Sequence, residues 1–328
     1  MRARAAIAAG LVVLIAASLF TGVGSITADA EGLWLVAVAA RPAPPPRCWR
    51  ARAASPGPRP AALLAGAGLA VAGVIMQMLA RNRFVEPTTA GTAQAAGLGL
   101  VVVTLVAPGS ALWLKMLAAT AAALVGTAGF LALVRRLPPQ EPLLVPLTGL
   151  VYGGILGAAT TFLAFERDLL QFLDIWMNGE FSGVLLGRYE FLWAAGAASA
   201  LAFVYAGRFT IAGLGEDASL NLGLRYGQVM AFGLALVSVI TAVTVVTVGM
   251  IPFVGLVVPN IVSRLRGDNL SATLPLVALS GAALVLACDI LARLLRYPYE
   301  IPVGTVLGVL GAGLFLWLLH GRPAHGRG

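Results

Sequence analysis

The chain has 328 residues, of which 59% are hydrophobic and only 11% are charged, whereas a soluble domain is roughly a quarter charged. This composition excludes an ordinary soluble domain, and the mean hydropathy of +0.91 predicts a membrane protein built from apolar helices. The net charge of +8 is typical of basic loops that face the cytoplasm, so nucleic acid is not expected as a partner.

Rare residue types narrow the chemistry further. The two cysteines, Cys48 and Cys288, are far apart, and both histidines lie in the C-terminal tail, so no disulfide framework, zinc site or membrane haem is indicated. Lys115 is the only lysine, and it is not in the Gly-Lys-Ser/Thr setting of a phosphate-binding loop. We therefore expect no catalytic residues, no metal site and no cofactor, and no ATPase activity by that route.

Hydrophobic runs predict an all-α fold of about ten membrane-spanning helices in a single transmembrane domain, 1–328. The first run lacks a clear small-residue cleavage site, so we interpret it as a membrane helix rather than a signal peptide. The eighth run is short enough to be a half-span. The predicted spans are 5–24, 61–80, 88–107, 111–134, 143–165, 189–207, 227–249, 252–263, 272–292 and 302–319.

The distribution of arginines predicts which ends of these spans face the cytoplasm. With the N-terminus inside, twelve of the 22 basic residues lie in cytoplasmic positions, and the bias becomes clearer when the outer loop 25–60 is set aside. That loop contains "RPAPPPRCWRARAASPGPRP", 41–60, which is too rich in proline to be helical. Two interpretations stay open: a genuine extended loop, or a reading-frame disturbance, because "RPAPPPRCWRARA" is compatible codon by codon with a shifted "RTAASLLAGAG".

Polar residues interrupt the apolar pattern at the end of the second span and in the turn after it. Gln77 lies at membrane depth, where a polar group is costly unless it faces protein or water. Asn82 and Glu86 can cap free backbone amides in the following turn, and Pro87 suits the first turn of the third helix.

Two later stretches also stand out. In "GMIPFVGLVVPNIVSRLRGDN", 249–269, Pro252, Gly255 and Pro259 predict a broken helix, which is tolerated at membrane depth only inside protein or beside a cavity. In "CDILARL", Asp289 precedes Arg293 in the favourable i,i+4 order. This pair can be structural, or it can be part of a charged outer rim that meets another protein.

The stretch "AGLGEDASLNLGLRYGQV", 212–229, is short and charged between two apolar runs. Glu216 and Asp217 fall in the first turn of a predicted helix, where negative charge is favourable. Ala218 and Leu222 share one face of that helix, and Gly223 allows a sharp turn after it. We interpret this cytoplasmic stretch, within 208–226, as an amphipathic helix offered to a partner, with a solvated loop as the alternative.

Together these stretches resemble the permease subunits of ABC importers for iron–siderophore complexes and cobalamin, over about 63–319. "RNRFVEPTTAG", "GRYE" and "VVPNIV" are most similar to the ferric-siderophore branch, especially the catecholate type. The departure is "SPGPRPAALLAG", where the family has an Arg-x-Pro-Arg element. The other motifs that carry the resemblance are "AGAGLAVAGVIMQ", "WMNGEFSGVLLGRYE", "GEDASLNLGL", "IPFVGLVVPNIV", "GDN", "CDILARL" and "YEIPVGTVLGVLGAGLFLWLL".

The resemblance implies a role for several residues. The cytoplasmic loop 213–226 would form the short coupling helices that sit in a groove of a cytoplasmic ATP-binding subunit. Asn82 and Phe84 match positions that narrow the inner mouth, faced by Gln140 and Glu141. Arg293 matches an arginine that docks the substrate-binding protein, with Arg296 one turn further on and Arg59 near the altered element.

The resulting hypothesis is a permease of the cytoplasmic (inner) membrane, with both termini inside, that moves a ferric siderophore by alternating access. Its implied partners are ATP-binding subunits, a periplasmic or lipid-anchored binding protein and a second permease subunit, identical or homologous. The alternative is an ion-coupled secondary transporter, for which Asp289 would be the membrane-embedded acid. A membrane-embedded enzyme is disfavoured because the chain has no nucleophile–base or metal-ligand cluster.

Overall fold

The structure, a computed structural model, describes residues 58–88, 91–134, 136–137, 144–181, 184, 189–295 and 301–320, together with 10, 27–28 and 34–35. The first predicted span, apart from Gly10, and most of the loop 25–60 lie outside these residues. The elements are β1 (Thr27–Ala28), β2 (Trp34–Leu35), α3 (Pro58–Leu79), α4 (Thr92–Val106), α5 (Leu112–Val134), α6 (Leu144–Phe165), α7 (Leu170–Met177), the 3-10 turn η1 (Tyr189–Phe191), α8 (Leu192–Ala212), α9 (Glu216–Asn221), α10 (Tyr226–Val248), α11 (Val254–Arg266), α12 (Leu270–Leu295) and α13 (Val303–His320).

The all-α prediction is confirmed, since the strands of the described part are only β1 and β2, an antiparallel pair of two residues each. Six helices (α3, α5, α6, α8 with η1, α10 and α12) are long and apolar enough to cross a membrane, and α4 and α13 are shorter apolar helices. The bounds agree with the predicted spans to within a few residues, except at α4 and α8.

Helix α8 runs to Ala212, beyond the predicted end at 207. The Arg208 guanidinium lies over the Tyr205 ring, 4.8 Å from its centroid. The charged group of Arg208 thus interacts with an aromatic ring of the same helix, and α8 can continue through this residue. The short helix α7 was not predicted, because eight residues cannot form a membrane span.

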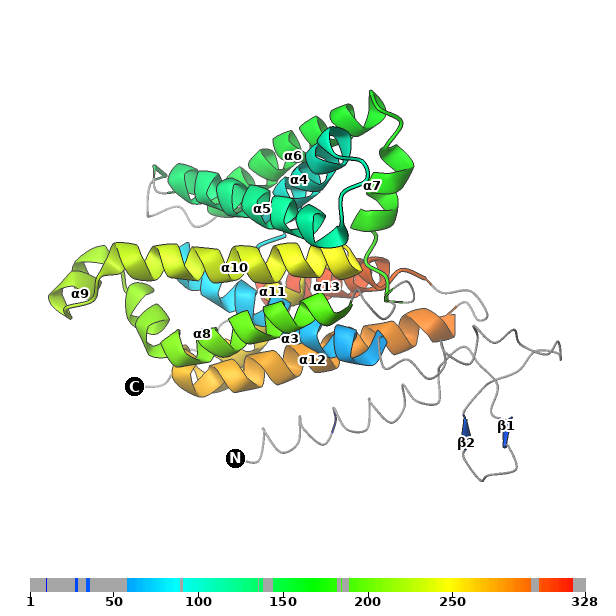
Figure 1. Cartoon of the computed structure of the whole chain (residues 1–328). Helices are drawn as coiled ribbons and strands as arrows, with labels where there is room; N and C mark the ends of the chain where they lie inside the picture. Colours follow the sequence, from blue (N-terminus) through cyan, green and yellow to red (C-terminus); the bar gives the residue numbers. More distant parts are fainter. Residues whose placement is uncertain are drawn as a thin grey trace.

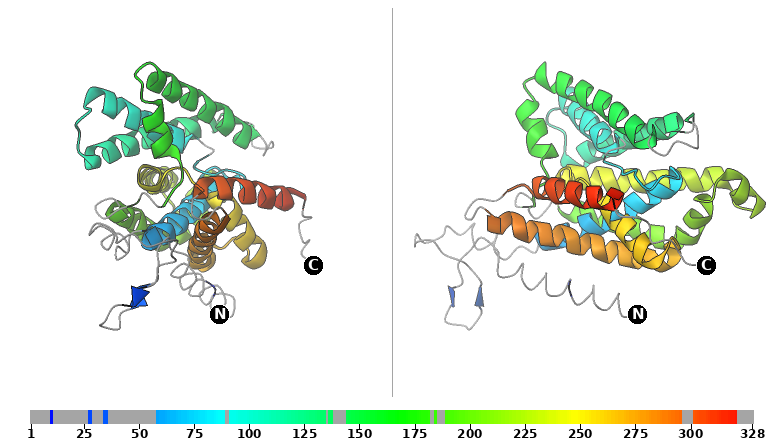
Figure 2. Two further views of the ribbon diagram at one scale, coloured as in Figure 1. Left: turned by 90° about the vertical axis from the view of Figure 1, so that its right-hand side faces the viewer. Right: turned by 180° about the vertical axis from the view of Figure 1, so that it is seen from behind.

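Helix α3 is the centre of the molecule. It packs against α8, α10, α11 and α12, while α4, α5, α6 and α7 form a second layer on the other side of α10 (Figure 1; Figure 2, left). Most of α3 is buried inside the protein, as expected for a helix that is apolar on every side.

Two glycine pairs let the neighbours of α3 approach closely. A Cβ on Gly73 would lie 2.0 Å from the carbonyl oxygen of Gly255 in α11, and a Cβ on Gly66 would lie 2.5 Å from that of Gly281 in α12. No side chain fits at such distances, so both contacts depend on glycine.

The chain between α10 and α11 leaves the helical path as the sequence predicted, but the residues involved differ. Pro252 lies in the break, 249–253, whereas Gly255 lies in the first turn of α11 and Pro259 lies inside that helix. The assignment of Gly255 and Pro259 as helix breakers is therefore wrong: α11 continues through both. The reason is a set of hydrogen bonds from other elements, described below.

At the other end of this break, the chain meets two distant segments. The N–H of Met250 donates to the Met177 carbonyl at 3.0 Å, and the N–H of Gly304 donates to the Gly179 carbonyl, also at 3.0 Å. Gly249, at φ 94°, lies against the backbone of Asn178. These bonds satisfy non-helical backbone that lipid could not satisfy.

Helix α4 begins at Thr92, four residues after the predicted start of the third span. Gly91 precedes it at φ 82°, and the N–H of Thr92 donates to the Pro87 carbonyl at 3.2 Å. Pro87 is therefore part of the turn and not of the first helical turn.

The Gly73–Gly255 contact yields a stability prediction. Gly73→Ala should lower the free energy of unfolding by about 1–3 kcal/mol, because a methyl group has no room beside the Gly255 carbonyl. The melting temperature of the purified protein in detergent measures this loss. The matched control is Gly154→Ala in α6, where no described atom lies within 4 Å of the new Cβ; equal losses in both variants would contradict the packing argument.

Candidate coupling and gating site

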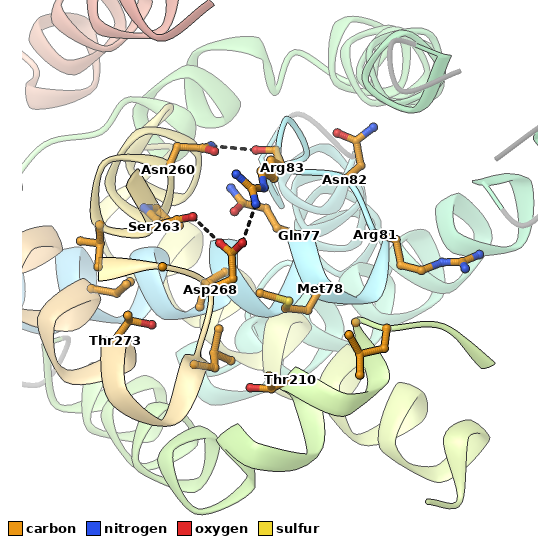
Figure 3. A pocket seen from close by; sticks show the side chains of 18 residues that line it. Gln77, Met78, Arg81, Asn82, Arg83, Thr210, Asn260, Ser263, Asp268 and Thr273 are labelled. Atoms are coloured by element: carbon orange, nitrogen blue, oxygen red, sulfur yellow. Dashed lines mark hydrogen bonds and ion pairs between the residues drawn. The ribbon is translucent and has the colours of Figure 1, made fainter. Parts of the chain in front are cut away.

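One end of the molecule brings together several of the polar residues that the sequence singled out, Gln77 and Asn82 among them. There the C-terminal ends of α3, α8 and α11 and the start of α12 surround a cavity of about 270 Å³. Its lining includes Gln77, Asn82, Asn260 and Asp268, and α9 projects from the same end of the molecule (Figures 1 and 3).

The structure forms a helix, α9, in the predicted coupling stretch. Glu216 and Asp217 occupy its first turn, where their charge is favourable. Gly223 follows at φ 74°, and the N–H of Leu224 donates to the Ser219 carbonyl at 2.9 Å. Glycine is suited to this left-handed turn because it has no Cβ.

The outer surface of α9 and its flanks is unusually apolar. Leu214, Leu220 and Leu222 are 65%, 56% and 63% exposed, and Ala218 is half-buried. Sequence reasoning found Ala218 and Leu222 but missed Leu214 and Leu220. A cluster of exposed leucines outside the membrane-spanning helices indicates a surface that a partner covers.

Ser219 anchors α9, and sequence reasoning missed it too. Its side chain is fully buried, and its Oγ lies 2.6 Å from the Gly215 carbonyl oxygen and 3.1 Å from that of Ile211 at the end of α8. The Oγ thus joins α9 to α8. A small hydroxyl in a charged segment gives no sequence signal for such a contact.

The predicted gate residues lie in the turn that follows α3, and we call residues 81–86 the gate turn. Asn82 is buried, and its Oδ1 accepts a hydrogen bond from the N–H of Phe84 at 2.8 Å. The Phe84 ring meets the Phe315 ring of α13 edge-on, with 6.0 Å between centroids. Gln140 and Glu141 lie outside the described residues.

Helix α11 and the loop that follows it hold the gate turn from the other side. Arg83 forms an ion pair with Asp268 at 2.5 Å, and Asp268 also accepts a hydrogen bond from the Ser263 hydroxyl. The Asn260 amide donates to the Arg83 carbonyl at 2.8 Å. Figure 3 shows this group at one edge of the cavity, joined from residues that are far apart in the sequence.

Glu86 caps backbone amides, as predicted, and these amides lie at the start of α11. Its carboxylate accepts hydrogen bonds from the N–H of Phe253 at 3.0 Å and of Gly255 at 3.2 Å. Phe253 has φ 68°, a strained conformation that these bonds help to hold. Burial raises the pKa of Glu86 to about 7, although both backbone bonds act in the opposite direction.

The Asp289–Arg293 pair lies on α12, away from this cavity, and it is more buried than an exposed rim requires. Its closest contact is 3.1 Å, and the side chains are 5% and 14% exposed. The side chain of Arg59 and all of Arg296 lie outside the described structure.

Known proteins resemble this chain throughout its length. The FecCD transport family matches residues 11–321. The petrobactin import system permease protein YclN of Bacillus subtilis is 44% identical over 263 residues, which are 80% of this chain and 83% of that protein. The petrobactin import system permease protein FatD of Bacillus anthracis is 38% identical over 309 residues, which are 94% of this chain and 88% of that protein.

A solved structure agrees with the fold. An inward-facing metal-chelate type ABC transporter superposes with a TM-score of 0.75 at 24% identity, over 97% of this chain and 99% of that chain. With the sequence relatives, this removes the ion-coupled secondary transporter and the enzyme as alternatives. The chain belongs to the FecCD transport family and is a multi-pass membrane permease.

Proposed function

We propose that this chain is the permease subunit that moves ferric-siderophore complexes across the bacterial cytoplasmic membrane by alternating access. The observation that carries the proposal is α9, a short helix with exposed leucines, in a chain without a phosphate-binding loop. Such a permease needs a separate ATPase, and it needs a surface that binds this ATPase and moves with its conformational changes. The names of the relatives support the substrate class, since they include petrobactin and ferric-anguibactin permeases.

The orientation follows from the charges. Arg81 and Arg83 follow α3, Arg225 precedes α10, and Arg264 and Arg266 end α11. Of these arginines, Arg81 and Arg83 line the cavity, together with residues from the ends of α8 and α11 and the start of α12. Arginine-rich ends face the cytoplasm, so we assign α9 and both termini to the inside and the chain as a whole to one permease domain.

In this mechanism the permease forms and breaks no covalent bond. A periplasmic or lipid-anchored binding protein delivers the chelate to the outer rim, and two permease subunits, identical or homologous, enclose the path. ATP binding and hydrolysis in cytoplasmic subunits then displace α9. The permease responds because its inward- and outward-open states differ little in free energy.

The coupling surface provides the main test of this function. Ala218→Arg would place a charged side chain in the contact with the ATPase, and Gly223→Pro would alter the turn at φ 74°. Each variant should weaken ATPase binding by about 2 kcal/mol or more, and uptake of radiolabelled ferric catecholate siderophore should fall with it. Co-purification and uptake, in a strain lacking its own permease, measure the two effects.

The matched control for this test is Gly227→Pro, a glycine in the first turn of α10 with no described atom near it, where proline is tolerated. All variants should insert into the membrane normally. ATPase binding and transport at wild-type levels in both α9 variants would contradict the coupling role. Absence of ferric-siderophore uptake by the wild type, with its ATPase and binding protein present, would contradict the substrate class.

The outer rim is tested by exchanging charges. If Arg293 docks the binding protein, Arg293→Glu and the exchange Asp289→Arg/Arg293→Asp should both weaken docking, more at low salt. Folding should suffer only in the single variant, by about 3–5 kcal/mol, because it breaks the buried ion pair and places a second carboxylate beside Asp289. Docking restored by the exchange would make the pair structural only.

The role of the gate turn is tested by measuring whether ATP hydrolysis becomes uncoupled from chelate transport. Asn82→Ala removes the acceptor for the Phe84 N–H, and Phe84→Ala removes the ring contact with Phe315. Both variants should keep the ATPase bound but hydrolyse severalfold more ATP per chelate transported, measured in proteoliposomes. Phe162→Ala, at a residue 62% exposed on α6, is the control, and unchanged coupling in both gate variants would remove these residues from the gate.

A further inference from the structure

Gln77 has a specific partner in α11. The side chain is buried in the last turns of α3, and its Nε2 donates to the carbonyl oxygen of Gly255 at 3.2 Å. A buried amide at this depth is costly unless it is hydrogen-bonded. The contact joins residues 178 positions apart.

The Gly255 carbonyl needs this donor because of Pro259. In an α-helix the carbonyl of one residue accepts a bond from the N–H four residues later, and that residue here is Pro259, which has no N–H. In a regular helix the proline ring also clashes with this carbonyl. Within α11, the regular bonding pattern therefore leaves the Gly255 oxygen without a donor.

We propose that Gln77 is a positioning residue that supplies the hydrogen bond removed by Pro259, and that it thereby fixes α11 beside α3 and the gate turn. The Gly73–Gly255 contact brings the two backbones close enough for the side chain to reach. Glu86 binds the amide side of the same turn, at Phe253 and Gly255. The first turn of α11 is thus held through its amides by the gate turn and through a carbonyl by α3.

The position of the first turn of α11 also determines where the later residues of this helix lie. Asn260 follows Pro259 directly and donates to the Arg83 carbonyl, and Ser263 supports the Asp268 carboxylate that binds the Arg83 guanidinium. A tilt of α11 would move these groups away from Arg83. Gln77 therefore acts on the gate turn through α11, and its effect on transport rests on the function proposed above.

The decisive experiment is a double-mutant cycle. Gln77→Leu keeps the size but removes the donor, so the melting temperature should fall because a buried acceptor is left unsatisfied. ATP hydrolysed per chelate transported should rise severalfold, as in the gate-turn variants. Pro259→Ala restores an N–H within α11. The double variant Gln77→Leu/Pro259→Ala should therefore recover both the melting temperature and the coupling ratio.

Two matched controls make the cycle specific. Pro275 is the sixth residue of α12, as Pro259 is the sixth residue of α11, so Gln77→Leu/Pro275→Ala should show no recovery. Gln228 is exposed near the start of α10, and Gln228→Leu should leave both measurements unchanged. The coupling ratio divides the ATP hydrolysed by the chelate transported. A loss of folded protein alone lowers both quantities and leaves the ratio unchanged.

Three results would overturn the proposal: no effect of Gln77→Leu, no rescue by Pro259→Ala, or equal rescue by Pro275→Ala. Rescue of the melting temperature without rescue of coupling would remove the link to the gate turn. The melting curves need no chelate, so they test the Gln77–Pro259 pair even if the wild type fails to transport a ferric siderophore. That failure would contradict the proposed function alone.

Discussion

The fold depends on one constraint: backbone N–H and C=O groups inside a membrane must find partners within the protein, since lipid offers none. Long helices meet the constraint by themselves, and six of the described helices are of this kind. Where the chain leaves the helical path between α10 and α11, partners come from distant elements. Met177, Glu86 and Gln77 each bind a backbone group of this region or of the first turn of α11.

Close packing follows from the same constraint. A side chain on α3 can reach the backbone of α11 only if the two helices nearly touch, and Gly73 and Gly255 allow this approach. The glycines that suit tight packing in lipid also bring polar side chains within range of backbone groups. Packing and hydrogen bonding at the C-terminal end of α3 are therefore one arrangement, and the cavity beside the gate turn lies next to it.

The features that the sequence predicts well are those set by local physics. Apolar runs that are long enough to span a bilayer predicted the positions of the long helices. Glu216 and Asp217 predicted the charged first turn of α9, and Gly223 predicted the left-handed turn after it. Pairings between distant segments were not predictable. Glu86 was correctly predicted to cap backbone amides, but these amides, of Phe253 and Gly255 at the start of α11, lie 167 and 169 residues further along. Pro259 suggests a broken helix unless the Gln77 amide is known to replace the missing bond.

The attachment of α9 to α8 through Ser219 has a mechanical consequence. At 1.5 Å per residue, the 21 residues of α8 form a rod about 30 Å long. A push on α9 of about one helical pitch, roughly 5 Å, would tilt a stiff rod of that length by about 10°. If α9 were joined only by a slack loop, the same push would be absorbed within a few residues. In the proposed function, the buried hydroxyl of Ser219 would make α8 a lever, through which a small movement of α9 on one side of the membrane would reach the other side.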